Sequence, residues 1–234
     1  MISKKGVRRI VYFVAFAAFM LLVGPWVYVN YFNEDAPTPF SQQQNGQESI
    51  NPNTGEADAT GLWTVSDGSQ VGYRIKEQIV LRKLEAVGRT ESVSGSLNIS
   101  QLEVNNVSIE VDMNSVQSDN SQRDRQFRER IMDTNTYPKS FFELEGSILL
   151  STEPEPGKTI LQSVTGNLTL RGVTKEVVFS ISGSFVNEEI TITGQIPIEF
   201  SEWGIPNPSV PAVFIFTEPN GLLEFSLVFK RAEV

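Results

Sequence analysis

Residues 164–170, VTGNLTL, decide the fold because apolar or glycine positions alternate strictly with polar positions through them. Val164, Gly166, Leu168 and Leu170 form one set, spaced two residues apart. Successive side chains of a β-strand point to opposite faces, so this spacing gives the segment one dry face and one wet face. The stretch therefore predicts a half-buried strand.

The same period of two recurs on both sides of this stretch and predicts roughly eight to ten strands in all. The alternating positions are Trp63 and Val65; Val71, Tyr73 and Ile75; Val93, Gly95, Leu97 and Ile99; Val107, Ile109, Val111 and Met113; Phe142, Leu144, Ile148 and Leu150; Val177, Phe179, Ile181 and Phe185; Ile190, Ile192, Ile196 and Ile198; and Leu223, Phe225, Leu227 and Phe229.

Short polar turns at residues 66–68, 187–188 and 219–221 predict antiparallel hairpins, and so a meander. A single sheet of this many strands buries its dry face by closing into a barrel or by folding over into a sandwich. An eight-stranded barrel has an interior that either fills with side chains or holds one slim ligand. The sequence thus predicts an all-β fold that permits ligand binding.

Two stretches break the period and are predicted as short helices, residues 77–85 and 121–132. Asp119 and Ser121 are the expected caps of the second helix, and Tyr137-Pro138 marks the return to extended chain. This helix is expected to plug one mouth of the barrel.

The composition excludes several classes of function. The chain has no cysteine and no histidine, which removes thiolate chemistry, disulfides, and the commonest general base and transition-metal ligand. With 28 acidic against 19 basic residues, it is not expected to bind nucleic acid. Asp119, Asp124 and Asp133 lack the spacing of a calcium loop and are interpreted as caps and turns. An enzyme would depend on carboxylates, Tyr or Lys, so we predict a non-enzyme without metal or cofactor.

The N-terminal part predicts a single-pass membrane anchor. Residues 10–32 carry no charge and are long enough to span a bilayer as a helix. Residues 1–9 hold four basic residues and Glu34 and Asp35 follow the run, which predicts a cytoplasmic N-terminus and an extracytoplasmic domain. Trp26, Tyr28, Tyr31 and Phe32 are the expected outer aromatic belt. The alternative is a cleaved signal peptide, whose only small-residue site, at residues 15–17, lies inside the run.

Residues 33–60 are rich in Pro, Gln and Gly and poor in apolar residues, which predicts a disordered linker. As a flexible coil it would reach on the order of 30 Å, so the domain of residues 61–234 would stay near the membrane.

Several motifs of residues 61–234 are similar to those of one known family. They are Trp63 with Ser69, Val71 and Tyr73; Arg123-Asp124 followed by Phe127 and Arg128; Tyr137-Pro138 leading to Phe142; and GNLTLRGVTK at 166–175. The domain resembles the YceI-like family of extracytoplasmic, lipocalin-like, polyisoprenoid-binding proteins. The resemblance implies an eight-stranded antiparallel barrel whose apolar interior takes up an isoprenoid chain. The sequence departs from the family in its apparent anchor, in the loop at 203–209, and in Ile131-Met132-Asp133 after the Arg-Asp motif.

These features together predict an isoprenoid or similar amphiphilic lipid as partner, bound at the outer face of the cytoplasmic membrane. Arg123 and Arg128 are the expected contacts of a ligand head group, or else members of a salt-bridged helix. Periodicity leaves open whether the expected lining is a ligand channel or packed core, and a filled barrel would indicate a structural or protein-interaction module. The expected lining residues are Phe127, Phe142, Leu144, Leu168, Phe179, Ile181, Ile192, Phe225 and Leu227.

Overall fold

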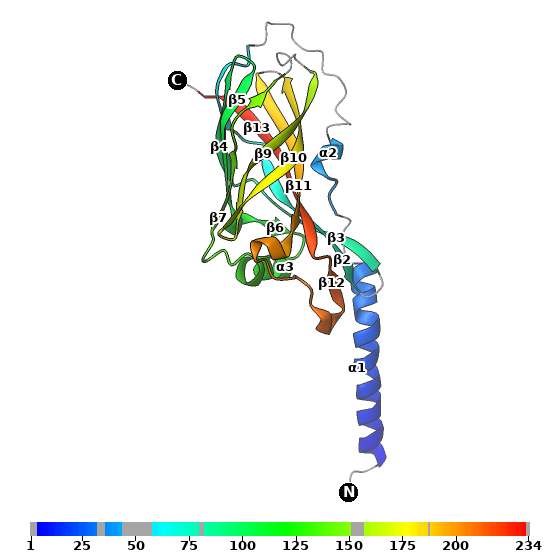
Figure 1. Cartoon of the computed structure of the whole chain (residues 1–234). Coiled ribbons are helices and arrows are strands. Elements are labelled where there is room, and N and C mark those ends of the chain that lie inside the picture. Colours follow the sequence, from blue (N-terminus) through cyan, green and yellow to red (C-terminus); the bar gives the residue numbers. More distant parts are fainter. Residues whose placement is uncertain are drawn as a thin grey trace.

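A computed structural model describes residues 4–31, 36–43, 58–79, 82–150, 157–186 and 188–232, and its strands form one closed barrel (Figure 1). The strands are β1 Gly61–Val65, β2 Gln70–Ile79, β3 Arg82–Thr90, β4 Val93–Ser100, β5 Glu103–Asp112, β6 Gln117–Ser118, β7 Lys139–Leu144, β8 Ile148–Leu149, β9 Thr159–Leu170, β10 Val173–Val186, β11 Glu189–Glu199, β12 Ile215–Thr217 and β13 Asn220–Arg231. The helices are α1 Lys4–Tyr31, α2 Phe40–Gln43 and α3 Ser121–Gln126, with shorter turns η2 Met113–Ser115, η3 Phe127–Ile131, η4 Phe200–Trp203 and η5 Pro211–Val213.

The barrel is closed by eight long strands, two of which are interrupted. β1 and β2 count as one strand because both pair with β13, and β3 and β4 count as the next because β3 pairs with β2 and β4 pairs with β1. The ring then runs through β5, β7, β9, β10 and β11 back to β13, and every neighbouring pair is antiparallel. The predicted all-β antiparallel barrel with a meander topology is confirmed. The closed form, and not the sandwich, buries the dry faces.

Two of the three predicted hairpin turns are wrong, because the chain keeps its direction through them. Val65 lies opposite Phe229 and Gln70 opposite Ser226 on the same edge of β13. Ser66 N donates to Val228 O at 2.8 Å and Ser69 Oγ accepts from Val228 N at 2.9 Å. Both serines thus bond to one residue of β13, and the two residues between them bulge out of a continuing strand.

The break at residues 219–221 is of the same kind, since β12 and β13 lie in succession along β2. The turn at 187–188 does join a hairpin, with Val186 opposite Glu189, although residue 187 lies outside the described part of the chain.

The predicted helix over residues 77–85 is also wrong. β2 and β3 form an extended hairpin there, with Ile79 opposite Arg82. The apolar pattern fails in this segment because Glu77 takes an inward position, where it pairs with Arg123 at 3.0 Å.

The predicted helix over 121–132 is confirmed as α3 followed by the π-helical turn η3. Its cap is Asn120, and not Asp119 or Ser121. The Asn120 side chain accepts hydrogen bonds from Gln122 N and Arg123 N, which frees Asp119 to pair with the Arg123 guanidinium.

Residues 10–31 of the uncharged N-terminal run lie within helix α1, whose large apolar side chains from Ile10 to Met20 are exposed. Over the described residues, no helix reaches the combined length and hydropathy that a membrane crossing requires, so the anchor stays a prediction. Of the expected aromatic belt, Phe32 and the side chains of Trp26, Tyr28 and Tyr31 lie outside the described part.

Residues 36–43 fall within the predicted linker yet pack against the outer wall of the barrel, where α2 contacts β11 and β13. We call these residues the strap. Phe40 of the strap is buried, and the guanidinium of Arg89 lies 3.9 Å from its ring centroid. A free coil is therefore not the structure of this segment. The remainder of the predicted linker, apart from residues 58–60, lies outside the described part.

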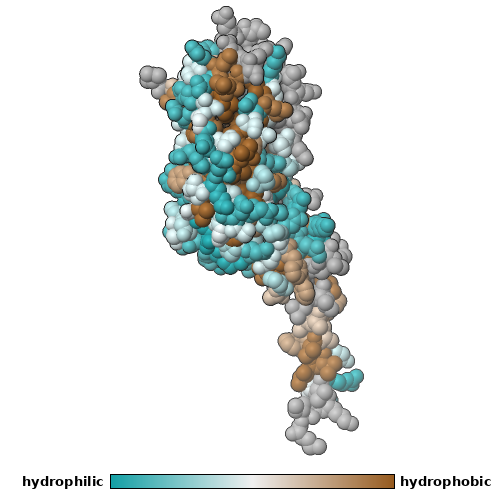
Figure 2. Space-filling view, in the orientation of Figure 1, coloured by the Kyte–Doolittle hydropathy of each residue, from teal (hydrophilic) through white to brown (hydrophobic). Residues whose placement is uncertain are grey.

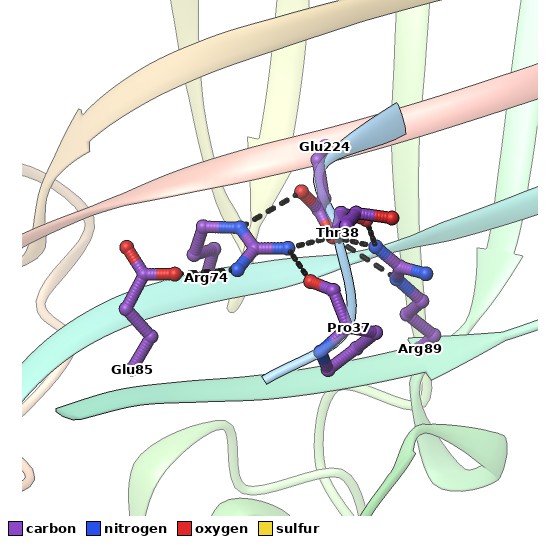
Figure 3. Close-up of polar contacts among 6 residues, drawn as sticks. All are labelled: Pro37, Thr38, Arg74, Glu85, Arg89 and Glu224. Atoms are coloured by element: carbon purple, nitrogen blue, oxygen red, sulfur yellow. Dashed lines mark hydrogen bonds and ion pairs between the residues drawn. The ribbon is translucent and has the colours of Figure 1, made fainter. Parts of the chain in front are cut away.

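The strap seals a buried charge network on β2, β3 and β13 (Figure 3). Glu224 has no exposed side-chain surface, and its carboxylate accepts from Arg74 Nε at 3.1 Å and from Arg89 Nη2 at 2.7 Å. The same arginines donate to the strap backbone, Arg74 to Pro37 O at 2.6 Å and Arg89 to Thr38 O at 2.8 Å. Each guanidinium thus joins the strap to the barrel.

We expect Glu224→Gln to lower the free energy of unfolding by about 3 kcal/mol, because it removes the fully buried carboxylate that Arg74 and Arg89 share, although Arg74 keeps its pair with Glu85. Thermal unfolding followed by circular dichroism measures the loss. The control is Glu189→Gln, which breaks the exposed Glu189–Lys230 pair and should cost less than about 1 kcal/mol. Equal losses in the two variants would contradict a special role for the buried network.

Gly172 turns the chain between β9 and β10 at φ +75°, where a Cβ would clash with the Tyr137 ring. Gly146 has nearly the same φ, +72°, but open space around it. We expect Gly146→Ala to cost about 1 kcal/mol from the left-handed backbone alone. Gly172→Ala should cost about 1–3 kcal/mol more from overpacking. Equal melting temperatures for the two variants would show that the Tyr137 contact does not matter.

Candidate ligand-binding cavity

Two buried apolar clusters lie toward the two ends of the barrel. One holds Trp63, Leu97 and Phe229, which are almost completely buried, and lies at the end where β1 pairs β13. The other gathers Phe127 and Trp203 with their neighbours at the α3 end. Phe142 and Phe225 touch both clusters. Leu97, Phe229 and Phe127 of these clusters also line the interior cavity, so the clusters form part of its wall.

A cavity of about 610 Å³ extends through the interior between and beside these clusters, with a largely apolar wall. Protein interiors are normally packed without voids larger than a water molecule, so this volume is far more than packing defects leave. It falls in the range of pockets that hold a small organic ligand. A barrel filled entirely by its own side chains, the alternative considered from the sequence, does not agree with this volume.

The structure brings all nine expected lining residues to the cavity wall. Three of them form an aromatic chain in which Phe179 meets Phe142 and Phe225 edge to face, with ring centroids 5.4 and 6.0 Å apart. The period of two found these positions because each inward residue of a closed barrel faces the same interior. Whether they contact a ligand stays a prediction.

Sequence reasoning missed a polar group inside the cavity, Glu77, because its segment was predicted as helix. Its partner Arg123 also lines the cavity and is paired on its other side with Asp119. Arg128, expected to contact the head group with Arg123, is not part of the wall. Only one of the two expected arginines is thus placed to reach a ligand, and it reaches the cavity as a member of a salt bridge.

Burial raises the pKa of the Glu77 carboxyl above its usual value, and the charge of Arg123 opposes this effect. Burial likewise raises the pKa of Tyr73, whose ring stacks on Phe127 at 5.2 Å between centroids. The polar end of the cavity therefore resists carrying unpaired charge.

The remaining expected carboxylates have structural partners. Asp124 is buried and accepts from Ser118 N at 2.9 Å and Ser118 Oγ at 2.6 Å. The backbone oxygen of Asp133 accepts from two turn amides, Thr136 N and Tyr137 N. Within the described residues, no group of three or more acidic side chains is placed to hold a metal ion.

The comparison with known proteins agrees with this geometry. The model of the YceI-like domain matches residues 63–229, which is well over half of the chain. The chain belongs to the YceI-like family. No curated protein matches the sequence.

Solved structures share the YceI-like fold at low sequence identity. A polyisoprenoid-binding domain from Saccharophagus degradans, implicated in plant cell wall breakdown, is 14% identical with a TM-score of 0.60, over 74% of this chain and 99% of that one. BcnA from Burkholderia cenocepacia is 19% identical with a TM-score of 0.53, over 70% and 98% of the two chains. The YCEI protein of Campylobacter jejuni is 16% identical with a TM-score of 0.50, over 62% and 85%. At these identities the likeness establishes the fold.

We expect the Glu77 carboxyl to titrate above the ordinary glutamate value of about 4.3, because burial disfavours its charged form. Its contribution to folding stability is then fully present below the ordinary pKa and is lost as the pH rises through the raised value. The carboxyl carbon shift in a pH series of NMR spectra measures the pKa. Arg123→Gln should raise the pKa further. A wild-type value at or below the ordinary one would contradict the expectation.

Proposed function

We propose that this YceI-like barrel binds a single apolar, isoprenoid-like lipid in its interior and performs no chemistry on it. The observation that carries the proposal is the cavity of about 610 Å³, walled by the inward side chains of all eight long strands. Burying hydrocarbon in such a space contributes about 0.8 kcal/mol for each methylene group, so a long chain binds tightly without a charged anchor. Selection is then mainly by length and bulk.

The ligand is proposed to lie with its chain along the aromatic series of Phe142, Phe179 and Phe225 and its polar end toward Arg123. The Arg123–Glu77 pair has one charge of each sign, which suits a polar but uncharged head group better than an ion. The polyisoprenoid-binding domain from Saccharophagus degradans supports the class of ligand, since it has the same fold.

We further propose that the chain acts at the outer face of the cytoplasmic membrane, held there by residues 10–32. The supporting observations are the uncharged run, its basic N-terminal flank and the acidic residues that follow it. Membership of the YceI-like family, whose proteins are extracytoplasmic, supports a location outside the cytoplasm. The lipid would leave the outer leaflet and enter a barrel that stays close to it, a binding or carrier role.

The test is mass spectrometry of an organic extract from the full chain, purified in mild detergent from its own membranes. We expect one prenyl-type lipid per protein. Ile181→Trp, which adds a large ring on the cavity side of β10, should lower lipid occupancy at least several-fold, whereas Val178→Trp on the exposed outer side of the same strand should leave occupancy unchanged.

Gly183→Leu is a second filling variant, because the glycine lines the cavity and has no atom nearer than 4.0 Å to its Cβ position. This variant replaces Ile181→Trp in the occupancy measurement if Ile181→Trp does not fold. Wild-type protein that is empty and fails to take up added prenyl alcohols or quinones would overturn the proposal.

A further inference from the structure

An exposed aromatic tip protrudes from the α3 end of the barrel. It consists of Phe214, which is 56% exposed, and Phe216, which is 48% exposed. Phe214 has φ +58°, a left-handed conformation that is costly for a bulky residue. Figure 2 shows a mainly hydrophilic barrel with apolar colour along one seam and at the narrow end that meets α1. A strained backbone that holds a phenyl ring in water indicates a surface with a partner.

Basic side chains lie beside this tip across the sheet. β12 pairs with β2, and β2 pairs with β3, so Phe216, Gln78 and Lys83 form one row on the outer face. In the next row of the sheet, Ile215 pairs with Ile79 and Ile79 pairs with Arg82. Arg82 and Lys83 are both exposed. Exposed aromatic rings flanked by basic side chains match a lipid interface, where rings enter the headgroup boundary and cations meet anionic lipids.

The strap independently directs the N-terminal helix to this end. Pro37 binds Arg74, and Thr38 binds Arg89, which lies opposite Gly72. The strap therefore runs away from Ile79 as its numbering rises, so its N-terminal end is the one nearer the tip. Six Cα–Cα steps separate Tyr31 from Pro37 and can span at most about 20 Å, whereas Arg74 lies about 17 Å from Ile79 along β2. In the view of Figure 1, α1 projects below the barrel, at the end where β12 and α3 lie.

The segment that carries the tip also covers the cavity. Ile205, Pro208, Val210 and Ile215 belong to the cavity wall, and Arg130 holds the loop by donating to Asn207 O and Pro208 O. One segment thus has a cavity side and an exposed aromatic side. It lies between the interior of the barrel and whatever the tip contacts.

We propose that the aromatic tip, with Arg82 and Lys83, docks on the surface of a lipid bilayer that contains anionic lipid. Docking places the loop at 205–215, and with it the α3 end of the cavity, against the membrane. The docking itself is independent of any cargo, whereas exchange of lipid through this end rests on the proposed function. The bilayer is the occupant because the aromatic rings, the adjoining cations and the direction of the strap all agree with it.

The test uses the full chain in vesicles of phosphatidylcholine with a minor fraction of phosphatidylglycerol. Because the sequence has no cysteine, Ala212→Cys places a single environment-sensitive fluorophore next to the tip, and Ser180→Cys places one on the exposed side of β10. Nitroxide-labelled lipid should quench the label at 212 several-fold more than the label at 180. Pure phosphatidylcholine, or Lys83→Glu, should reduce that difference.

Two double variants complete the test. In the Ala212→Cys background, Phe214→Ser with Phe216→Ser should bring the quenching down to that of the control site. Leu161→Ser with Val178→Ser removes two exposed apolar side chains elsewhere on the barrel and should leave the quenching unchanged. Equal quenching at 212 and 180, or greater quenching at 180, would overturn the proposal, whether or not the cavity holds lipid.

Discussion

The barrel is held closed by β13, which has ladder partners along both of its edges. One edge pairs with β11 from Asn220 to Lys230, and the other pairs first with β2 and then with β1. Closure removes the free sheet edges that a strand this long would otherwise expose. It also fixes which side chains face inward, because a slip of one residue would exchange the two faces of the strand. Phe225 therefore lines the cavity, and Glu224 points to the outer wall.

The same alternation supplies both core and cavity, and the difference between them is one of packing. Large side chains pack together around Trp63 at one end and around Phe127 at the other, where Phe127 also faces the cavity. Between the ends, Phe142, Phe179 and Phe225 meet edge to face and leave space beside them. A ligand site built in this way needs no special sequence motif, because it arises where inward side chains fall short of the barrel axis.

The outer wall has an organisation of its own. The buried network of Arg74, Arg89 and Glu224 ties the strap to β2, β3 and β13. A segment that composition marks as flexible is thereby fixed in direction, because its backbone carbonyls accept hydrogen bonds from the buried guanidinium of Arg74 and the half-buried guanidinium of Arg89. The direction of residues 36–43 along the barrel wall follows from these contacts.

By itself the sequence determined the strand periodicity, the antiparallel all-β class and the inward positions of the strands, since each depends on residue spacing that a β-strand converts directly into facing. The choice of a closed barrel over a sandwich came from the resemblance to the YceI-like family, because spacing is the same in both. It misread the breaks at 66–68 and 219–221 as hairpins, because a turn sequence does not specify whether the chain reverses or bulges. It missed Glu77, whose inward side chain pairs with Arg123, a residue 46 positions away. The cavity, the docked strap and the exposed tip were decided by tertiary structure, because each depends on contacts between segments far apart in the chain.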